Sequence, residues 1–340
     1  MKYCKICLQP DTRPNTYFSD NQICPACNYF FLLKNVDWEE RYEILHDLIT
    51  KNPKRHGQYF DCIIGVSGGK DSTRQAIWLR DKLKLKPLLV AQSYPPEQIT
   101  EVGVANISNL IELGFDVVIN APAPQTWRKL CKEAFLKFSN WCKATELALF
   151  ACVPQMAIKY QIPIILWGEN PGLQLGDLKT LGKNGYDGNN LRNMNTLGGG
   201  DLSWQLEIIK EKKYLIPFQY PSIKEFEDHK IQIIYLGWFL GDWSLIKNAM
   251  YSTSVGLDIR SDTVSETGDY WGVTSLDEDW VTLNQLIKYY KYGFGRVTDY
   301  MNEAIRNKQI SREKAIQIVE RFDDSCSDKY IKSFCEYINI

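Results

Sequence analysis

The sequence predicts an α/β protein with a doubly wound parallel sheet, an N-terminal four-cysteine zinc ribbon and a helical C-terminal extension. Between residues 60 and 167, short apolar runs alternate with segments of helical periodicity. This alternation is typical of β-α-β units, in which helices cover both faces of a parallel sheet. Two Cys-x-x-Cys pairs precede this region, and amphipathic segments rich in aromatic residues follow residue 231. These three observations together define the predicted architecture.

The alternating region can be divided into individual elements. Four apolar runs predict strands, over residues 60–66, 87–92, 116–120 and 163–167, and the first of them is predicted to be buried. Apolar residues that recur every three or four positions predict helices over 38–51, 72–84, 100–113, 127–138 and 144–160. Gly114 is suited to end the helix over 100–113, because glycine adopts the left-handed conformation without strain.

These elements group into four segments. We expect a zinc ribbon over 1–36, a helical linker over 37–57, an α/β domain over 58–230 and a C-terminal extension over 231–340. The boundary before the α/β domain is placed at the polar, basic stretch from Lys51 to Gly57.

Composition narrows the class of protein. Forty basic and 41 acidic residues give a net charge of −1, so the chain lacks the strong positive field of a nonspecific nucleic-acid binder. No apolar run approaches the length of about 20 residues that crosses a bilayer. The first residues, from Met1 to Cys4, do not resemble a secretory signal. We therefore expect a cytoplasmic protein without a membrane or nucleic-acid partner.

Four of the ten cysteines have the spacing of a metal site. Cys4 and Cys7 form one Cys-x-x-Cys pair, and Cys24 and Cys27 form a second after 16 intervening residues. Two such pairs provide the four thiolates of a tetrahedral Zn²⁺ site, which stabilises a segment too small for its own core. Turn-forming residues between the pairs favour a hairpin. Four unrelated buried thiols are the alternative, and the other six cysteines have no metal spacing.

A glycine-rich loop follows the first strand. It consists of the residues Gly65-Val66-Ser67-Gly68-Gly69-Lys70-Asp71-Ser72. The backbone amides of the paired glycines and the N-terminus of the next helix are suited to bind an anion. Asp71 is incompatible with a phosphate site unless a divalent cation such as Mg²⁺ is present. An ordinary glycine turn is the alternative, and the loop matches neither of the common nucleotide fingerprints.

The hexapeptide from Ser67 to Ser72 resembles the Ser-Gly-Gly-x-Asp-Ser signature of the PP-loop ATP pyrophosphatases. The resemblance implies that the chain binds ATP with Mg²⁺, cleaves it between the α and β phosphates, and adenylates an oxygen of an acceptor. In this superfamily the end of the second strand, at Ala91 and Gln92, is the expected seat of adenine.

Three further matches resemble the N-acetyl sugar amidotransferases within that superfamily. They are the segments Cys4–Asn15, Gly168–Pro171 (Gly-Glu-Asn-Pro) and Tyr292–Asp299. This resemblance implies conversion of the acetamido group of a bacterial surface sugar, as in lipopolysaccharide or flagellin glycosylation, to an acetamidino group. It also implies that ammonia comes from a separate glutaminase subunit, because the chain shows no glutaminase nucleophile of its own.

These resemblances assign roles to particular residues. Lys70, Asp71, Glu169 and Asn170 are the expected catalytic residues. The expected ATP-binding residues are Gly65, Ser67, Gly68, Gly69, Lys70, Asp71, Ser72, Ala91, Gln92 and Gly168. Asp71 is the expected Mg²⁺ ligand, and the Gly- and Asn-rich segment over 168–203 is expected to form a mobile lid over the site.

Two other functions remain open from the sequence. A tRNA thiolation enzyme would share the ribbon and the loop, but such enzymes commonly carry further catalytic cysteines. Cys131, Cys142 and Cys152 are poorly spaced for that role. A noncatalytic nucleotide sensor is the third reading, and Asp71 disfavours it, because binding alone has little need of a carboxylate beside the phosphates.

Overall fold

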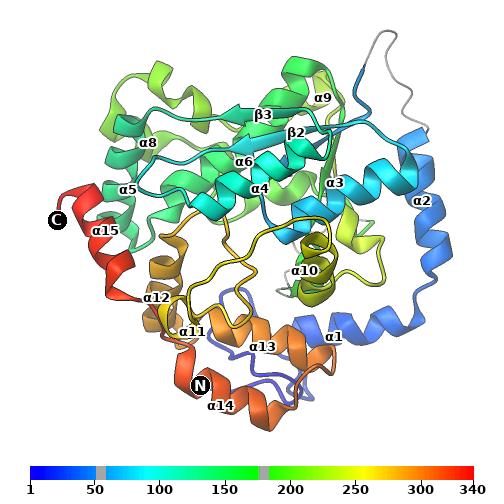
Figure 1. The fold of residues 1–340 in the computed structure, drawn as a ribbon, viewed down its shortest axis with the longest axis vertical. Helices are drawn as coiled ribbons and strands as arrows, with labels where there is room; N and C mark the ends of the chain where they lie inside the picture. Colours follow the sequence, from blue (N-terminus) through cyan, green and yellow to red (C-terminus); the bar gives the residue numbers. More distant parts are fainter. Residues whose placement is uncertain (51–58, 175, 177–183) are drawn as a thin grey trace.

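The computed structural model describes residues 1–50, 59–174, 176 and 184–340. A five-stranded, fully parallel sheet forms its centre, with the strand order β3-β2-β1-β4-β5 (Figure 1). The strands are β1 Cys62–Val66, β2 Pro87–Gln92, β3 Val117–Asn120, β4 Ile164–Trp167 and β5 Gln232–Tyr235. The doubly wound parallel sheet predicted from the sequence is confirmed.

Helices cover both faces of the sheet because successive residues of a buried strand point to opposite sides. Ile63 of β1 packs in a core with α5 (Pro124–Phe138) and α6 (Cys142–Tyr160). The next residue, Ile64, packs in a second core with helices of the other face. Those helices are α2 (Trp38–Thr50), α3 (Lys70–Leu83) and α4 (Glu101–Glu112).

Local sequence signals account for the ends of two of these helices. Gly114 follows α4 with a φ of +90°, as its position in the sequence predicts. The structure begins α3 at Lys70, two residues before the predicted start, with Gly69 as the N-cap. Lys70, Asp71 and Ser72 therefore belong to the first turn of α3 rather than to the loop.

The sheet extends past residue 230, where the sequence predicted the α/β domain to end. β5 begins at Gln232 and pairs with β4, so that boundary cuts through the sheet. This strand is short and opens an aromatic-rich segment, which is why its pattern was assigned to the extension. The predicted boundary at 57 lies outside the described residues.

The segment predicted as a mobile lid is largely ordered where the structure describes it. From residue 184 onward it forms the 3₁₀ turns Asn189–Asn193 and Gly198–Gly200 and the helix α8 (Ser203–Ile209). Leu191 and Leu197 are buried in the core beside α6. These spaced leucines anchor the segment despite its glycines and asparagines, so residues 184–203 do not form a free lid. The rest of the predicted lid includes residues 175 and 177–183, which lie outside the described residues.

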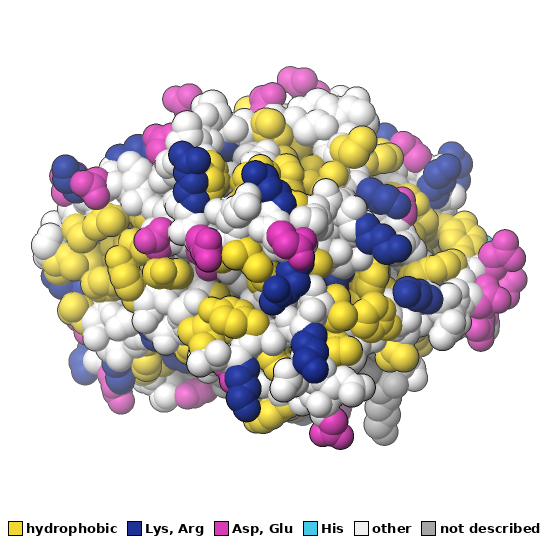
Figure 2. All heavy atoms as spheres, turned by 90° about the horizontal axis from the view of Figure 1, so that it is seen from below, with side chains coloured by type: hydrophobic (Ala, Val, Ile, Leu, Met, Phe, Trp, Pro, Cys, Tyr) yellow, Lys and Arg dark blue, Asp and Glu magenta, His cyan; other side chains and the backbone are white. Residues whose placement is uncertain are grey.

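Five of the remaining helices form a second layer beneath the sheet in Figure 1. They are α10 Leu245–Thr253, α11 Val264–Thr267, α12 Val281–Tyr292, α13 Arg296–Arg306 and α14 Arg312–Phe322. The helix α9 (Ile223–Asp228) lies at the upper end of the molecule, and α15 (Asp328–Ile338) lies beside α5. The N-terminal segment lies against α13 and α14 at the lower end of the molecule. On the face seen in Figure 2, basic and acidic side chains are interspersed with apolar ones.

The N-terminal segment is not a β-hairpin. Residues 1–24, all described, contain turns, bends and isolated bridges, including an antiparallel bridge between Tyr3 and Pro10, and α1 (Pro25–Leu32) follows Cys24. The four cysteines therefore sit in a knuckle-like arrangement without strands, which corrects the predicted hairpin.

Candidate functional site

The loop between β1 and α3 owes its shape to Gly68. This residue has a φ of +73°, and a Cβ atom there would lie 2.9 Å from the carbonyl oxygen of Gly103 on α4. Only glycine satisfies both the left-handed backbone and the close approach of α4. The following residue, Gly69, is extended and leads into the N-terminus of α3, whose free amides are suited to an anion.

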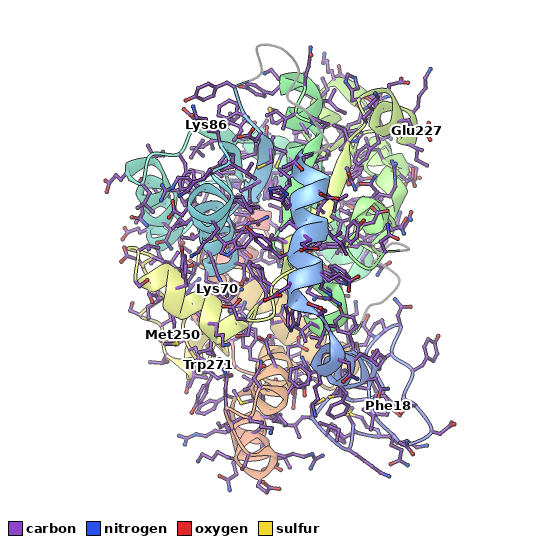
Figure 3. The ribbon with its side chains drawn as sticks, turned by 90° about the vertical axis from the view of Figure 1, so that its right-hand side faces the viewer. Phe18, Lys70, Lys86, Glu227, Met250 and Trp271 are labelled. Atoms are coloured by element: carbon purple, nitrogen blue, oxygen red, sulfur yellow. The ribbon has the colours of Figure 1, made fainter. Side chains whose placement is uncertain are left out.

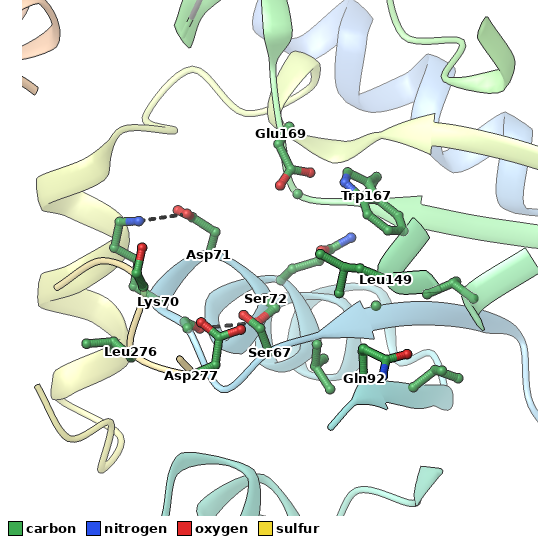
Figure 4. A pocket seen from close by; sticks show the side chains of 18 of the residues that line it. Ser67, Lys70, Asp71, Ser72, Gln92, Leu149, Trp167, Glu169, Leu276 and Asp277 are labelled. Atoms are coloured by element: carbon green, nitrogen blue, oxygen red, sulfur yellow. Dashed lines mark hydrogen bonds and ion pairs between the residues drawn. The ribbon is translucent and has the colours of Figure 1, made fainter. Parts of the chain in front are cut away.

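A cavity of about 210 Å³ opens beside this loop (Figure 4). Its walls come from the loop, the ends of β2 and β4, α6 and a segment over 273–277. Because parallel strands end at the same edge, β1, β2 and β4 bring residues far apart in sequence to one place. In Figure 4, Glu169 and Asp277 lie on opposite sides of the side chains of Ser67 and Ser72.

One wall of the cavity is apolar. The rings of Phe150 on α6 and Trp167 on β4 are stacked with their centroids 5.4 Å apart. Gly65 makes room for this pair, since a Cβ atom there would lie 3.0 Å from Val153 and 3.2 Å from the Trp167 ring. Such a surface is suited to the flat face of a base or to a sugar ring.

The other wall carries charge. Lys70 Nζ lies 2.8 Å from Asp71 Oδ2, and the side-chain amide of Asn248 on α10 donates to Asp71 Oδ1 at 2.6 Å. Ser252, also on α10, donates to the backbone carbonyl of Lys70 at 2.6 Å. Figure 3 shows Lys70 next to α10, which carries Met250. Burial alone would lower the pKa of Lys70, but Asp71 outweighs it and the pKa is raised, so the ammonium is stable.

Two further carboxyl groups face the same space. Glu169 is exposed to the cavity, and burial among the surrounding elements together with the charge of Asp71 raises its pKa to about 7. Burial also raises the pKa of Asp277, whose Oδ2 accepts a hydrogen bond of 3.0 Å from Tyr94. A Glu that titrates near neutral pH is suited to take up or release a proton.

The donor set fits a divalent cation of the magnesium type. Asp71 and Glu169 supply carboxylate oxygens, which Mg²⁺ prefers, on one side of the cavity. Burial is the larger cause of the raised pKa of Glu169 and the charge of Asp71 adds to it, so a bound cation would relieve the repulsion between the two carboxyl groups. Asp71 and Glu169 are thus the residues that would hold the ion.

Most of the residues predicted to bind ATP line the cavity. They are Gly65, Ser67, Gly69, Lys70, Asp71, Ser72, Gln92 and Gly168, and the predicted catalytic residue Glu169 joins them. Gly68 shapes the loop without lining the cavity. Ala91 does not: it is buried in the core on the α3 side of the sheet, while its neighbours Val90 and Gln92 reach the cavity. The alternation of side chains along β2 explains this difference and corrects the assignment of Ala91.

Asn170, predicted to be catalytic, points away from the cavity. Its Nδ2 donates to the carbonyl oxygen of Gly237 at 3.3 Å, and its Oδ1 accepts from the amide of Leu173. Only 1% of the residue is exposed. Asn170 therefore fixes the start of α7 (Pro171–Gln174) and positions the preceding Glu169, instead of meeting a substrate.

The sequence did not predict the contribution of the C-terminal half. Asn248, Ser252 and the segment over 273–277 all belong to the predicted extension, yet they hold or line the loop. Arg260 braces that segment by donating to the carbonyl oxygens of Ser275 and Glu278. The acidic run from Asp277 to Asp279 was the one local signal, and acidic runs are common on solvated surfaces.

The four cysteines form a second site. All four are buried, and their sulfur atoms lie within 4.8 Å of one another. The Sγ atoms of Cys7 and Cys24 are 3.6 Å apart, which is close to the spacing of about 3.8 Å that zinc–sulfur bonds of 2.3 Å impose on a tetrahedron. Backbone amides of Ile6 and Cys24 donate to Cys4 Sγ, an arrangement that stabilises thiolate. The donor set therefore fits a single metal ion such as Zn²⁺.

The other cysteines form no metal cluster within the described part of the chain. Cys62, Cys131, Cys142 and Cys152 are buried, and burial raises the pKa of each thiol. Cys62, Cys131 and Cys142 are small core side chains, as predicted, whereas Cys152 also lines the cavity.

Comparison with known families matches one part of the chain. Residues 267–340 match the family model described as "LPS biosynthesis protein WbpG-like, C-terminal domain". This segment includes the cavity wall over 273–277 and the helices α12 to α15. The part of the chain that resembles a lipopolysaccharide-biosynthesis domain therefore contributes directly to the candidate site.

Other similarities are more distant. An uncharacterized protein (MJ1599) of Methanocaldococcus jannaschii is 33% identical over 88 residues, which is 26% of this chain; the match spans about a third of that relative's length, 31%. The structure of a "predicted subunit of tRNA methyltransferase" from the same organism gives a TM-score of 0.30 at 15% identity, covering 56% of this chain and 73% of that one. The structure of the U34-tRNA thiolase NcsA of Methanococcus maripaludis, with its [4Fe-4S] cluster, gives a TM-score of 0.32 at 14% identity. The match covers 98% of this chain and 95% of that one.

None of the helices in the described residues is long and apolar enough to traverse a bilayer.

Proposed function

We propose that this chain is a PP-loop enzyme that uses ATP to convert the acetamido group of a bacterial surface sugar to an acetamidino group. One observation carries the proposal: the segment similar to a lipopolysaccharide-biosynthesis domain forms a wall of the cavity that contains the loop from Ser67 to Ser72. The loop supports a reaction on ATP, and that wall supports a sugar of the surface-polysaccharide class as acceptor.

In this reaction the loop binds the triphosphate. Backbone amides at Gly69 and at the N-terminus of α3 face the anion, and Lys70 adds a positive charge that Asp71 holds in place. Stacked against Phe150, Trp167 offers a flat surface to the adenosine or the sugar. Mg²⁺ held by Asp71 and Glu169 would neutralise the charge that develops on the departing pyrophosphate.

The acceptor is activated before nitrogen is added. An amide carbonyl is a poor electrophile, so its oxygen first attacks the α phosphorus, and the bond from that phosphorus to pyrophosphate breaks. Ammonia then adds to the carbon of the O-adenylyl imidate, and the carbon–oxygen bond breaks to release AMP. In this second step, after pyrophosphate and its Mg²⁺ have left, Glu169 is placed to accept a proton from the added nitrogen, because without a bound cation its pKa of about 7 lets it change state near neutral pH.

The state of Cys152 supports this function over tRNA thiolation. This residue lines the cavity and would be the candidate sulfur carrier. Burial raises the pKa of its thiol to about 12, and its Sγ donates to the carbonyl oxygen of Leu149 at 3.1 Å. A thiol held in this state is a weak nucleophile. Thiolation therefore remains the second candidate.

Three further expectations belong to the same proposal. The ammonia is supplied by a separate glutaminase subunit, the four cysteines hold structural Zn²⁺, and the reaction takes place in the cytoplasm.

Mass spectrometry of acetylated sugars incubated with the protein, ATP, Mg²⁺ and ammonium tests the proposal. We expect replacement of one oxygen by NH, with one AMP formed for each product. Formation of ADP alone, or incorporation of sulfur into tRNA under matched conditions, would count against it. K70M should lose AMP formation, whereas K82M, on the same helix and exposed, should keep it.

A further inference from the structure

A buried arginine lies next to the four-cysteine site, because the residue before it, Ile305, packs against the four cysteines. Arg306, at the C-terminal end of α13, is only 5% exposed. Burial would lower its pKa, but the charges of Cys7 and Cys27 raise it, with contributions from Glu303 and Cys24. A buried cation persists only where negative charge or hydrogen-bond acceptors compensate for its lost hydration.

The described contacts leave part of that cation uncompensated. One guanidinium nitrogen of Arg306, Nη2, donates to the carbonyl oxygen of Leu173 at 3.1 Å. Its Nε is buried and has no hydrogen-bond partner among the described residues. The carboxylate of Glu303 also accepts a hydrogen bond of 2.6 Å from the backbone amide of Leu245, so its negative charge is divided between Arg306 and α10. Four thiolates around one Zn²⁺ carry a net charge of −2, which would complete the compensation.

The rest of α13 holds the same segment. Asp299, Asn302 and Arg306 are three and then four residues apart, so they share one face of the helix. Asp299 pairs with Arg13, and Asn302 Oδ1 accepts a hydrogen bond of 2.7 Å from the backbone amide of Leu8. This face of α13 is therefore the surface that receives the cysteine-bearing segment.

Arg306 also contacts the segment that follows the cavity. Leu173 belongs to α7, which begins at Pro171, two residues after Glu169. Just beyond α7, Gly176 packs against Ala26 of α1, since a Cβ atom at Gly176 would lie 2.6 Å from the amide nitrogen of Ala26. The metal site and the candidate catalytic glutamate are thus connected through one side chain and one short helix.

We infer that Arg306 is an outer-sphere partner of the metal in the four-cysteine site, and that it ties this site to the segment carrying Glu169. Arg306 is a positioning residue in this account: it touches neither the metal nor a substrate. The occupied site keeps the arginine in place, and the arginine keeps α7 in place.

Zinc affinity tests the first half of the inference without any enzyme assay. Competition with a chromophoric chelator should show that R306M binds Zn²⁺ about 10- to 100-fold more weakly than the unmodified chain, as is usual when an outer-sphere partner is lost. R306K, which keeps the charge, should recover most of this affinity. R321M, an exposed arginine on the adjacent α14, should bind normally. Wild-type affinity in folded R306M would overturn the inference.

If R306M does not fold, R306Q replaces it, since glutamine removes the charge and keeps an amide donor on a shorter side chain; the same loss of affinity is expected. The second half is tested on the unmodified chain by hydrogen exchange before and after zinc removal. The backbone amides of Gly172, Leu173 and Gln174 should exchange faster once zinc is removed. Faster exchange confined to residues 1–32 would show that the metal stabilises only the N-terminal segment. It would refute the connection between the metal site and α7.

Discussion

The side-chain amide of Asn248 donates a hydrogen bond of 2.6 Å to Asp71. These residues are 177 positions apart, and the contact joins the first turn of α3 to α10. Arg74 in turn donates to Asn248 Oδ1, so the amide can present only its NH₂ group to the carboxylate. Asp71 is therefore oriented by a residue outside the strand–loop–helix motif that the sequence suggests.

N248A should reduce AMP formation. A hydrogen bond to a charged group contributes about 1.5–3 kcal/mol, so kcat/KM should fall by roughly 10- to 100-fold. K247A, an exposed change on the same helix, is the matched control. Pyrophosphate release measured for both variants checks this, and equal activity would mean that Asn248 does not orient Asp71.

The raised pKa of Glu169 should make stability depend on pH. Between its ordinary value of 4.5 and about 7, the folded protein keeps a proton that the unfolded chain has lost. The contribution of Glu169 to the free energy of unfolding is thus fully present below pH 4.5 and is lost as the pH rises through 7. Urea unfolding without nucleotide should show this decline, and E169Q should remove it. E112Q, on the exposed surface of α4, should retain the wild-type pH dependence.

G68A should be less stable than a change at another left-handed glycine. Gly114 has a φ of +90° with no neighbouring atom within 4 Å of a Cβ, so G114A incurs only the backbone cost of about 1–2 kcal/mol. G68A adds a close contact with the backbone of Gly103, worth about 1–3 kcal/mol more. Thermal unfolding of the two variants gives the comparison; equal losses would mean that α4 shifts to make room.

C24S should abolish stable metal binding. Four thiolates complete the tetrahedron, and a hydroxyl group is a poor substitute for one of them. Metal analysis should find about one zinc ion per folded wild-type chain and almost none in the variant. C335S changes a cysteine outside the cluster and should leave the zinc content unchanged. Full zinc content in C24S would contradict the assignment of the site.

R260M should destabilise the fold and loosen the cavity wall. Arg260 is 9% exposed and pairs with Asp262 and Asp279 while it donates to the backbone of Ser275. Removing one partner of a buried ion pair costs about 3–5 kcal/mol. K137M breaks a pair with Glu207 in which both side chains are exposed, and should cost less than about 1 kcal/mol. Urea unfolding distinguishes the two.

The α/β core was predictable because its signals are local. The strands β1, β2 and β4 each have a buried apolar run, the edge strand β3 has a partly exposed one, and the loop at Gly68 sits where such sheets bind ligands. The predicted Cys-x-x-Cys pairs likewise converge, since short spacing leaves few alternatives. In these regions a few consecutive residues are enough to predict the local structure.

The features of the site that the sequence did not predict depend on contacts between residues far apart in the chain. The sequence locates the end of β2 but does not show which of its side chains point to the cavity. Because side chains alternate along a strand, that of Ala91 points into the core. Asn170 follows Glu169 directly but turns to cap α7. Asn248 and Asp277 lie far along the chain, and their role follows from the packing of α10 and of the wall over 273–277. No local pattern contains that information.

The hydrogen bond between Leu8 and Asn302 joins residues 294 positions apart. During synthesis the cysteine-bearing segment emerges long before the helix face that receives it. The nascent chain therefore exposes four reactive sulfurs on the ribosome until α13 arrives, and early capture of zinc is what would keep them from oxidation in that interval.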